Sequence, residues 1–246
     1  MLFRDRAVIR LETIDSTNNY AANLIKLSTP PDGTVITAQE QTNGRGQRGS
    51  FWESDPGENL LCSIVYYPQF LNSSNHFYLM KAAALAVREL VEDLTQRDTF
   101  IKWPNDIMVQ NKKIAGMLVE AAWNDQKMQS AVVGIGLNLN QENFESLHAT
   151  SARLLTGSRV DVDDCLVQLL QLTDKYMMRL QSGGYSEISK QYRENLFRLG
   201  QVAHFIYQDR PLNAMITGVD EEGRLRLYTE QGEILNCGLK EIKFVL

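Results

Sequence analysis

A short segment near residue 45 concentrates residue types that could bind an anion. Glycine adopts positive φ readily and lets a ligand approach the backbone closely. Arginine carries a permanent charge on a planar fork that matches carboxylate or phosphate oxygens. These properties suit a mobile loop that folds over an anionic ligand, although the spacing alone also fits a solvated turn between two strands. The segment lacks the glycine patterns of Walker and dinucleotide-binding loops, and it interleaves three glycines with two arginines: Gly44, Arg45, Gly46, Arg48 and Gly49.

Two other regions carry polar residues in unusual runs. On residue types alone, the run at residues 15–18 would cap a helix. The lysine pair at residues 112–113 would be the polar tip of a hairpin. In chain order the runs are Asp15-Ser16-Thr17-Asn18, then Lys102-Trp103-Pro104-Asn105-Asp106, and shortly afterwards Lys112-Lys113-Ile114-Ala115-Gly116.

Together and in this order, the loop and these runs resemble the biotin–protein ligases, also called biotin–acetyl-CoA-carboxylase ligases. The resemblance covers nearly the whole chain and is strongest over residues 14–140. It implies an α+β fold with a mixed β-sheet and flanking helices, as in class II synthetases. This biotin- and ATP-binding catalytic domain would span residues 1–198, and a small SH3-like β-barrel domain would span 199–246. The residue pattern also changes near residue 200, since short strand-like segments separated by turn residues follow from Gln201 onward.

The resemblance also implies an activity. The chain would be an ATP-dependent ligase that activates biotin as biotinyl-5'-AMP and transfers it to one lysine of a biotin carboxyl carrier protein or domain. Activation is needed because hydroxide is a poor leaving group for a lysine amine to displace, whereas AMP is a good one. ATP and biotin would be substrates, and Mg²⁺ would accompany ATP. The ligands of the magnesium ion stay open.

Individual residues receive roles from the same resemblance. The helix start at residues 16–18 would contact the ureido ring of biotin, and the amide of Gln41 suits a cyclic urea because it can donate and accept. Lys113 would touch the biotin carboxylate and the α-phosphate, and Asp106 would act on the nucleotide side through ribose or magnesium. The expected catalytic residues are Arg45, Lys113 and Asp106. The expected substrate contacts are Ser16, Thr17, Asn18, Gln41, Gly44, Arg45, Gly46, Gln47, Arg48, Trp52, Lys102, Trp103, Asn105, Asp106, Lys113, Gly116 and Asn138.

Gln47 departs from the family pattern, since many bacterial relatives have arginine or lysine after the second glycine of the loop. Glutamine carries no charge, so Arg45, with Arg48, would have to neutralise the adenylate phosphate. We therefore predict weaker retention of the adenylate than in relatives with arginine there. The first catalytic strand is expected within the first ten residues, without a preceding helix-turn-helix segment, which predicts no operator binding and no repressor function.

Composition narrows the class of protein. The 246 residues are 43% hydrophobic and 22% charged, with a formal net charge of −5, and the pI near 5.3 argues against a nucleic-acid binder. The cysteines, Cys62, Cys165 and Cys237, are far apart and lack metal or disulfide spacing, which suits a reducing compartment. No signal-peptide core or membrane-length apolar run is visible. We expect a cytoplasmic protein without DNA or membrane partners, and a homodimer stays open.

Periodicity predicts the elements that would position these residues. An apolar stripe over residues 76–95 is the clearest helical signal, and the Gly-x-Gly at 134–136 fits a buried strand with two points of close approach. Strands are expected over 7–11, 33–39, 59–67, 100–103, 107–109, 114–121 and 131–140, with a tight turn at 111–113, an irregular connection over 150–160, and helices over 18–27, 76–95, 162–180 and 184–197.

Three alternatives stay open. A lipoate–protein ligase uses the same adenylation chemistry, so residues 16–18 and Gln41 would have to discriminate between the two acids. An octanoyltransferase would need a cysteine nucleophile, and no cysteine lies near the glycine–arginine loop or residues 102–106 in the sequence. A biotin or nucleotide sensor would bind without transferring anything.

Overall fold

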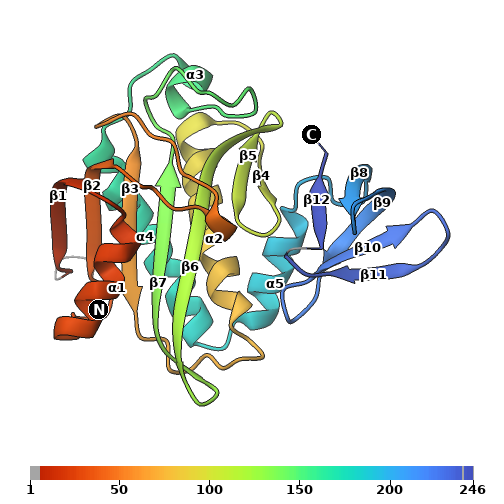
Figure 1. Cartoon of the computed structure of the whole chain (residues 1–246), viewed down its shortest axis with the longest axis horizontal. Coiled ribbons are helices and arrows are strands. Elements are labelled where there is room, and N and C mark those ends of the chain that lie inside the picture. Colours follow the sequence, from red (N-terminus) through yellow and green to blue (C-terminus); the bar gives the residue numbers. More distant parts are fainter. Residues whose placement is uncertain (1–5, 240, 246) are drawn as a thin grey trace.

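A seven-stranded mixed sheet forms the larger part of the protein in the computed structural model, which describes residues 6–239 and 241–245 (Figure 1). Its strand order is β1-β2-β3-β7-β6-β5-β4, and β1 and β2 are parallel while the other neighbours are antiparallel. The strands are β1 (Val8–Ile14), β2 (Val35–Gln41), β3 (Leu60–Tyr66), β4 (Thr99–Lys102), β5 (Asp106–Val109), β6 (Lys112–Asn124) and β7 (Lys127–Leu137).

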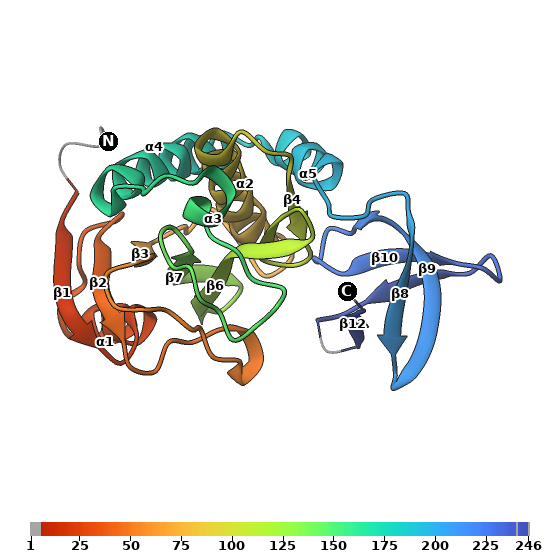
Figure 2. The ribbon, with the colours of Figure 1, turned by 90° about the horizontal axis from the view of Figure 1, so that it is seen from above.

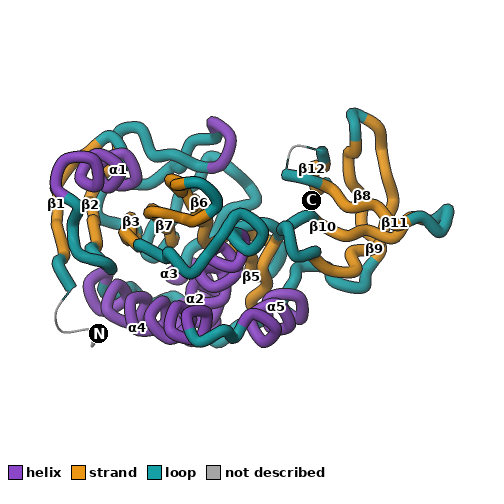
Figure 3. Tube along the Cα trace, turned by 90° about the horizontal axis from the view of Figure 1, so that it is seen from below, coloured by secondary structure: helices purple, strands orange, loops and turns teal. Residues whose placement is uncertain are grey.

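Helices cover both faces of this sheet. Figures 2 and 3 show α1 on one face and α2 and α4 in a layer on the other, with α5 leading toward the C-terminal strands. This arrangement confirms the predicted α+β class with a mixed sheet and flanking helices. The helices are α1 (Thr17–Ser28), α2 (Phe77–Thr95), α3 (Ala152–Thr156), α4 (Val162–Gln181) and α5 (Tyr185–Glu194).

The pattern of burial explains these layers. All seven residues of β3 are buried, as expected for a strand that is covered on both faces. Leu60 and Ile64 contact the core formed with α2 and α4, while Val65 packs with residues of α1. The apolar stripe of α2 is buried as predicted. Hydrophobic burial therefore stabilises the central strands. Polar residues at the ends of these strands can then form a site.

A second sheet follows near the C-terminus. It is antiparallel in the order β11-β10-β9-β8-β12. The turn between Tyr207 and Arg210 places Gln208 and Asp209 at φ 50° and 60°. Two such left-handed residues are typical of a type I′ hairpin. The SH3-like barrel and the boundary at residue 198 stay predictions. The strands are β8 (Val202–Tyr207), β9 (Arg210–Val219), β10 (Leu225–Thr229), β11 (Ile234–Cys237) and β12 (Ile242–Phe244).

Some expected element boundaries were wrong. The β5–β6 turn lies at Gln110 and Asn111, whose φ values are 49° and 63°, so both lysines of the predicted turn belong to β6. The expected irregular connection contains α3, which begins at an N-cap bond from Leu154 N to Ser151 Oγ. The last helix ends at Glu194 instead of Phe197.

Candidate functional site

A cavity of about 230 Å³ lies on the α1 face of the larger sheet. Its wall is built from the start of α1, the loop after β2, and the facing strands β6 and β7. The structure brings most of the predicted contact residues to this one cavity. The predicted residues that line it are Ser16, Thr17, Asn18, Gln41, Arg45, Gly46, Gln47, Trp52, Asn105, Asp106, Lys113 and Gly116.

One end of the cavity is the start of α1. The N-cap residue Ser16 makes no side-chain capping bond, so the simple capping role open from the sequence is not realised. Instead the Oε1 atom of Gln41 accepts from Thr17 N at 2.8 Å and lies 3.0 Å from Thr17 Oγ1. The side chain of Gln41 thus satisfies a helix-terminal N–H, and its Nε2 group stays available as a donor.

Buried hydroxyl and amide groups form the floor at this end. Ser63 Oγ lies 2.7 Å from Asn18 Oδ1 and 2.8 Å from Thr17 Oγ1, and all three residues are at most 4% exposed. The Asn18 oxygen can only accept, so the single Ser63 proton must point to it. The Thr17 proton then goes to Ser63 or to Gln41. The hydroxyl and amide groups of Ser63 and Asn18 are therefore oriented before a ligand arrives, and only the Thr17 proton has two possible acceptors.

The glycines of β7 make room for the floor and the wall. A Cβ atom on Gly134 would collide with the Asn18 amide, and one on Gly136 would lie 2.6 Å from Trp52 Cζ2. Gly136 pairs directly with Gly116 of β6, where a Cβ would lie 3.0 Å from Trp52 Cζ3. The Gly-x-Gly signal in the sequence therefore does mark two points of close approach, as predicted.

The other end of the cavity is charged. Lys113 Nζ lies 2.7 Å from Asp106 Oδ1, and Lys102 Nζ lies 3.5 Å from Asp106 Oδ2. Lys113 and Asp106 therefore form an ion pair across the hairpin of β5 and β6. A register shift in the β5–β6 pair, beside Met108, places Lys113 opposite Met108 and Gly116 opposite Asp106. The bulge brings Lys113 onto the same face as Asp106, since one added residue reverses the alternation.

The glycine–arginine loop covers the cavity. Its two arms meet where Trp52 N donates to Gly44 O at 2.9 Å, and Arg45 forms an isolated bridge with Phe51. Trp52 stands over the cavity with Lys113 Nζ 5.3 Å from its ring. Its indole Nε1 is buried and has no hydrogen-bond partner among the described residues. The side chain of Arg48 lies outside the described part of the structure.

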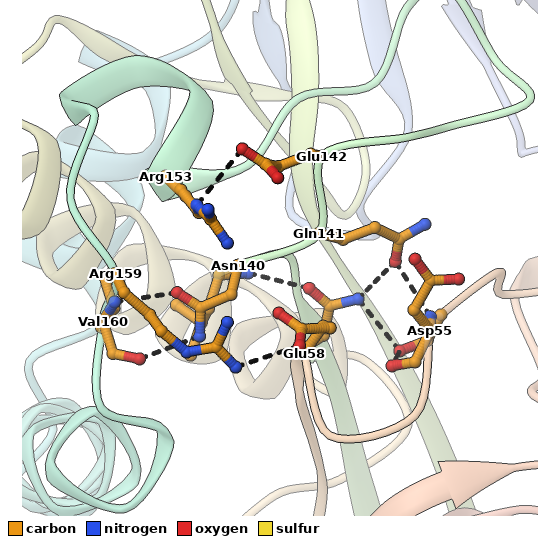
Figure 4. Close-up of polar contacts among 11 residues, drawn as sticks. Asp55, Glu58, Asn140, Gln141, Glu142, Arg153, Arg159 and Val160 are labelled. Atoms are coloured by element: carbon orange, nitrogen blue, oxygen red, sulfur yellow. Dashed lines mark hydrogen bonds and ion pairs between the residues drawn. The ribbon is translucent and has the colours of Figure 1, made fainter.

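Buried amides hold the downstream arm of this loop (Figure 4). Gln141 Oε1 accepts from Asp55 N at 3.0 Å and from Asn59 Nδ2 at 2.6 Å. Asn140 N donates to Glu58 O, and the Asn140 side chain exchanges two bonds with the backbone of Val160. These bonds fix the chain after Ser54 to the end of β7, so Trp52 emerges from an anchored stem.

Among the predicted contact residues whose side chains the structure describes, four do not line the cavity. Lys102 reaches Asp106 from outside it and lies 5.3 Å from the Phe244 ring. Gly44 is buried under Trp52. Asn138 donates to Thr150 O at 3.0 Å, and its Oδ1 atom is buried without a partner in the described chain. Trp103 donates its Nε1–H to Gly223 O at 2.9 Å, toward the second sheet.

Cys62 corrects one argument from the sequence. It lines the cavity, so the expectation that no cysteine lies near the loop was wrong, because distance along the chain is not distance in space. Burial raises the pKa of its thiol to about 12. A nucleophile must be a thiolate, so this cysteine is held in the unreactive form.

Sequence reasoning missed several residues that contribute to the site. Ser63 and Cys62 lie on a strand that gave only an apolar signal, and Asn19 follows directly after the predicted run. Glu120 could have been found by counting alternate residues of β6 from Gly116, since they share one face.

Residues 11–138 match the biotin/lipoate A/B protein ligase family, and the chain belongs to this family. The chain is 28% identical to the bifunctional ligase/repressor BirA of Bacillus spizizenii, over 92% of this chain and 70% of that protein. It is also 28% identical to the biotin–[acetyl-CoA-carboxylase] ligase of Paracoccus denitrificans, with 90% and 94% of the two chains covered. A solved biotin protein ligase from Aquifex aeolicus, in complex with biotin and ATP, superimposes with a TM-score of 0.81 at 26% identity, covering 97% and 99% of the chains.

The described residues contain neither a membrane-spanning helix nor a cluster of metal-binding side chains. No helix among them is long and apolar enough to cross a membrane. No group of three histidine, cysteine or acidic side chains lies close enough to hold a metal ion in residues 6–239 and 241–245.

Proposed function

We propose that this protein is a biotin–protein ligase that forms biotinyl-5'-AMP from biotin and ATP and then biotinylates a lysine of a carboxyl carrier protein. The observation that carries the proposal is the polarity of one covered cavity. A fixed amide and hydroxyl cluster lies at one end, and Lys113 with Asp106 lies at the other. This arrangement suits an acid with a polar cyclic head and a carboxylate that must meet a phosphate.

The head-group end favours a cyclic urea. Gln41 presents free N–H donors because its oxygen is occupied by Thr17, and a urea carbonyl accepts such bonds. The dithiolane ring of lipoate offers no comparable donor or acceptor. A site built for hydrogen bonds rejects a ligand that leaves buried polar groups unpaired, so we infer a preference for biotin over lipoate.

Lys113 would bring the two anions together. One oxygen of the biotin carboxylate attacks the α-phosphorus of ATP, the bond to the pyrophosphate oxygen breaks, and pyrophosphate leaves. A cation beside the reacting oxygens stabilises the additional negative charge of the transition state. In the second step the carrier lysine, as the free amine, attacks the acyl carbon, AMP leaves, and the nitrogen loses a proton.

Asp106 fits a magnesium ion that arrives with ATP. Mg²⁺ is commonly bound by one or two carboxylates together with substrate phosphates, and Asp106 is the acidic residue that lines the cavity. Bound at this place, the ion would neutralise charge on the leaving pyrophosphate. The absence of a larger cluster among the described residues is consistent with a metal held mainly by the nucleotide.

The covering loop would protect the adenylate. A mixed anhydride reacts with water, and closing a site removes that competitor. The anchored stem after Ser54 and the bond between the two arms keep Trp52 over the cavity.

Pyrophosphate exchange into ATP tests this proposal. We expect exchange that depends on biotin and that falls to background when lipoate replaces it. Exchange with lipoate alone would instead identify a lipoate–protein ligase. Acyl transfer without ATP that Cys62→Ser abolishes would identify a transferase, whereas the proposal expects Cys62→Ser to retain exchange.

A further inference from the structure

Glu120 connects the covering loop to the head-group end of the cavity. Its Oε1 atom accepts from Arg45 Nη2 at 2.7 Å, and its Oε2 atom accepts from Arg45 Nη1 at 3.2 Å. The same Oε2 atom accepts from Asn18 Nδ2 at 2.9 Å. A single carboxylate on β6 therefore holds an arginine of the loop and an amide of the cavity floor.

Both terminal nitrogens of the Arg45 guanidinium make hydrogen bonds within the protein. Besides Glu120, its Nη1 atom donates to Asn19 Oδ1 at 2.7 Å. Both terminal nitrogens are thus bonded to residues of this chain, and three of their four N–H groups are used in these bonds. Lys113 is then the cation placed to meet the reacting oxygens.

The geometry is stronger than that of an ordinary surface ion pair. The side chains of Arg45 and Glu120 are 40% and 35% exposed, and isolated pairs at such exposure contribute little. Here the contact is bidentate, and the carboxylate is shared with Asn18, which is only 4% exposed. Bidentate pairs and networks are the cases in which such contacts become effective.

We propose that Glu120 is a positioning residue that latches the glycine–arginine loop closed through Arg45 and orients Asn18 at the same time. Closure and head-group binding are then coupled, because both depend on one carboxylate. The inference rests on the proposed function. It deepens that function by giving Arg45 the task of closure instead of phosphate neutralisation.

Glu120→Gln is the direct test, because it keeps the shape of the side chain and removes its charge. With purified full-length protein, we expect biotinyl-5'-AMP to dissociate about tenfold faster and the KM for biotin to rise by a similar factor, about 1.4 kcal/mol in affinity. The KM for ATP is expected to stay within about twofold of the wild-type value. The exposed pair between Arg10 and Asp163 provides a matched control, and Asp163→Asn should change none of these quantities.

A double-mutant cycle separates the latch from a phosphate contact. If Arg45 acts through Glu120, Arg45→Met combined with Glu120→Gln should release the adenylate no faster than the more damaging single change. If the increases in release rate caused by the two single changes multiply in the double variant, Arg45 acts independently of Glu120 and the latch is overturned. Wild-type release rates in Glu120→Gln would also overturn it. If Glu120→Gln does not fold, Asn19→Ala, which removes the third partner of Arg45, should still accelerate release.

The outcome is distinguishable from failure of the proposed function. Wild-type protein without biotin-dependent pyrophosphate exchange would remove the proposed function itself. Wild-type exchange together with unaltered variants would remove only the latch.

Discussion

Lys113 is the residue on which the proposed chemistry depends most directly. Its ammonium group shares the cavity with Trp52 and Asp106, and it reaches that position only because a bulge in the β5–β6 pair turns it inward. Its neighbour Lys112 is exposed. Two adjacent lysines of equal charge thus occupy opposite environments.

This contrast gives a paired prediction. Lys113→Ala should lower the rate of biotin-dependent pyrophosphate exchange at least about 100-fold, since one preorganised electrostatic contact is worth that much in a transition state. Lys112→Ala, the matched control, should retain exchange. Equal rates for both variants would show that neither lysine meets the reacting oxygens.

Gln47 gives a second prediction at the scale of one residue. It lines the cavity at the position where many relatives carry a positive charge. Gln47→Arg should slow dissociation of biotinyl-5'-AMP, because a guanidinium there would add a charge-assisted contact to the phosphate. Stopped-flow or chase measurements of the release rate test this. An unchanged rate would refute the idea that Gln47 weakens retention.

At the scale of elements, the site is where α1 and the facing strands β6 and β7 meet beneath the loop after β2. Gly116 and Gly136 are directly opposite each other in that pair, and both lie beneath Trp52. A side chain at either position would push the indole away. The position of the Trp52 ring therefore depends on two glycines that are paired in register on β6 and β7.

Gly136→Ala tests this property. The added methyl group would overlap the indole, so we expect the KM for biotin to rise at least about tenfold, with a stability loss of about 1–3 kcal/mol from overpacking. Adding Trp52→Phe should recover part of the biotin affinity, because the smaller ring leaves room. An unchanged KM in Gly136→Ala, measured by exchange kinetics, would contradict the close approach.

The elements show what a sequence can and cannot predict here. The periodicity of α2 and the apolar run of β3 identified the core, because burial imposes a regular pattern. The bulge that orients Lys113 left no such signal, since one inserted residue changes no composition. Trp103 lies in the most distinctive motif, yet its indole bonds to Gly223 O. A motif records that a residue matters and does not record which neighbour it faces.

At the scale of the whole molecule, the second sheet supports the end of the cavity that carries Asn105 and Asp106. The segment that carries Asn105 and Asp106 is held from behind by Trp103 on Gly223 and by Tyr192 Oη donating to Pro104 O at 2.8 Å. Gly223 itself packs against the ring of Phe77 at the start of α2. The turn between β9 and β10 therefore contacts both Trp103 and the start of α2.

Lys81 lies at the same junction and predicts a dependence of stability on pH. The residue is 2% exposed and donates to Ser189 Oγ of α5 at 3.0 Å. Desolvation lowers the pKa of its ammonium group to about 8, although Asp220 and Glu221 act in the opposite direction. Because the pKa is lower in the folded state, the unfolded state binds more protons between pH 8 and the ordinary lysine value of 10.5.

Burying the charged ammonium group of Lys81 should therefore lower the free energy of unfolding. This destabilisation is complete below about pH 8 and disappears as the pH rises toward 10.5. Lys81→Met should remove this destabilisation, making the variant more stable than the wild type at pH 7 by up to about 3 kcal/mol. Urea denaturation of both proteins at several pH values measures the difference. A difference that does not shrink as pH rises would show that Lys81 is not desolvated.

Mass spectrometry of a biotin carboxyl carrier domain incubated with this protein, biotin and MgATP tests the proposed ligase activity. We expect one biotinyl group in amide linkage on a single carrier lysine, and none when ATP is omitted or when Lys113→Ala replaces the wild type. A carrier domain that stays unmodified in the complete reaction, or one that is modified equally without ATP, would contradict it.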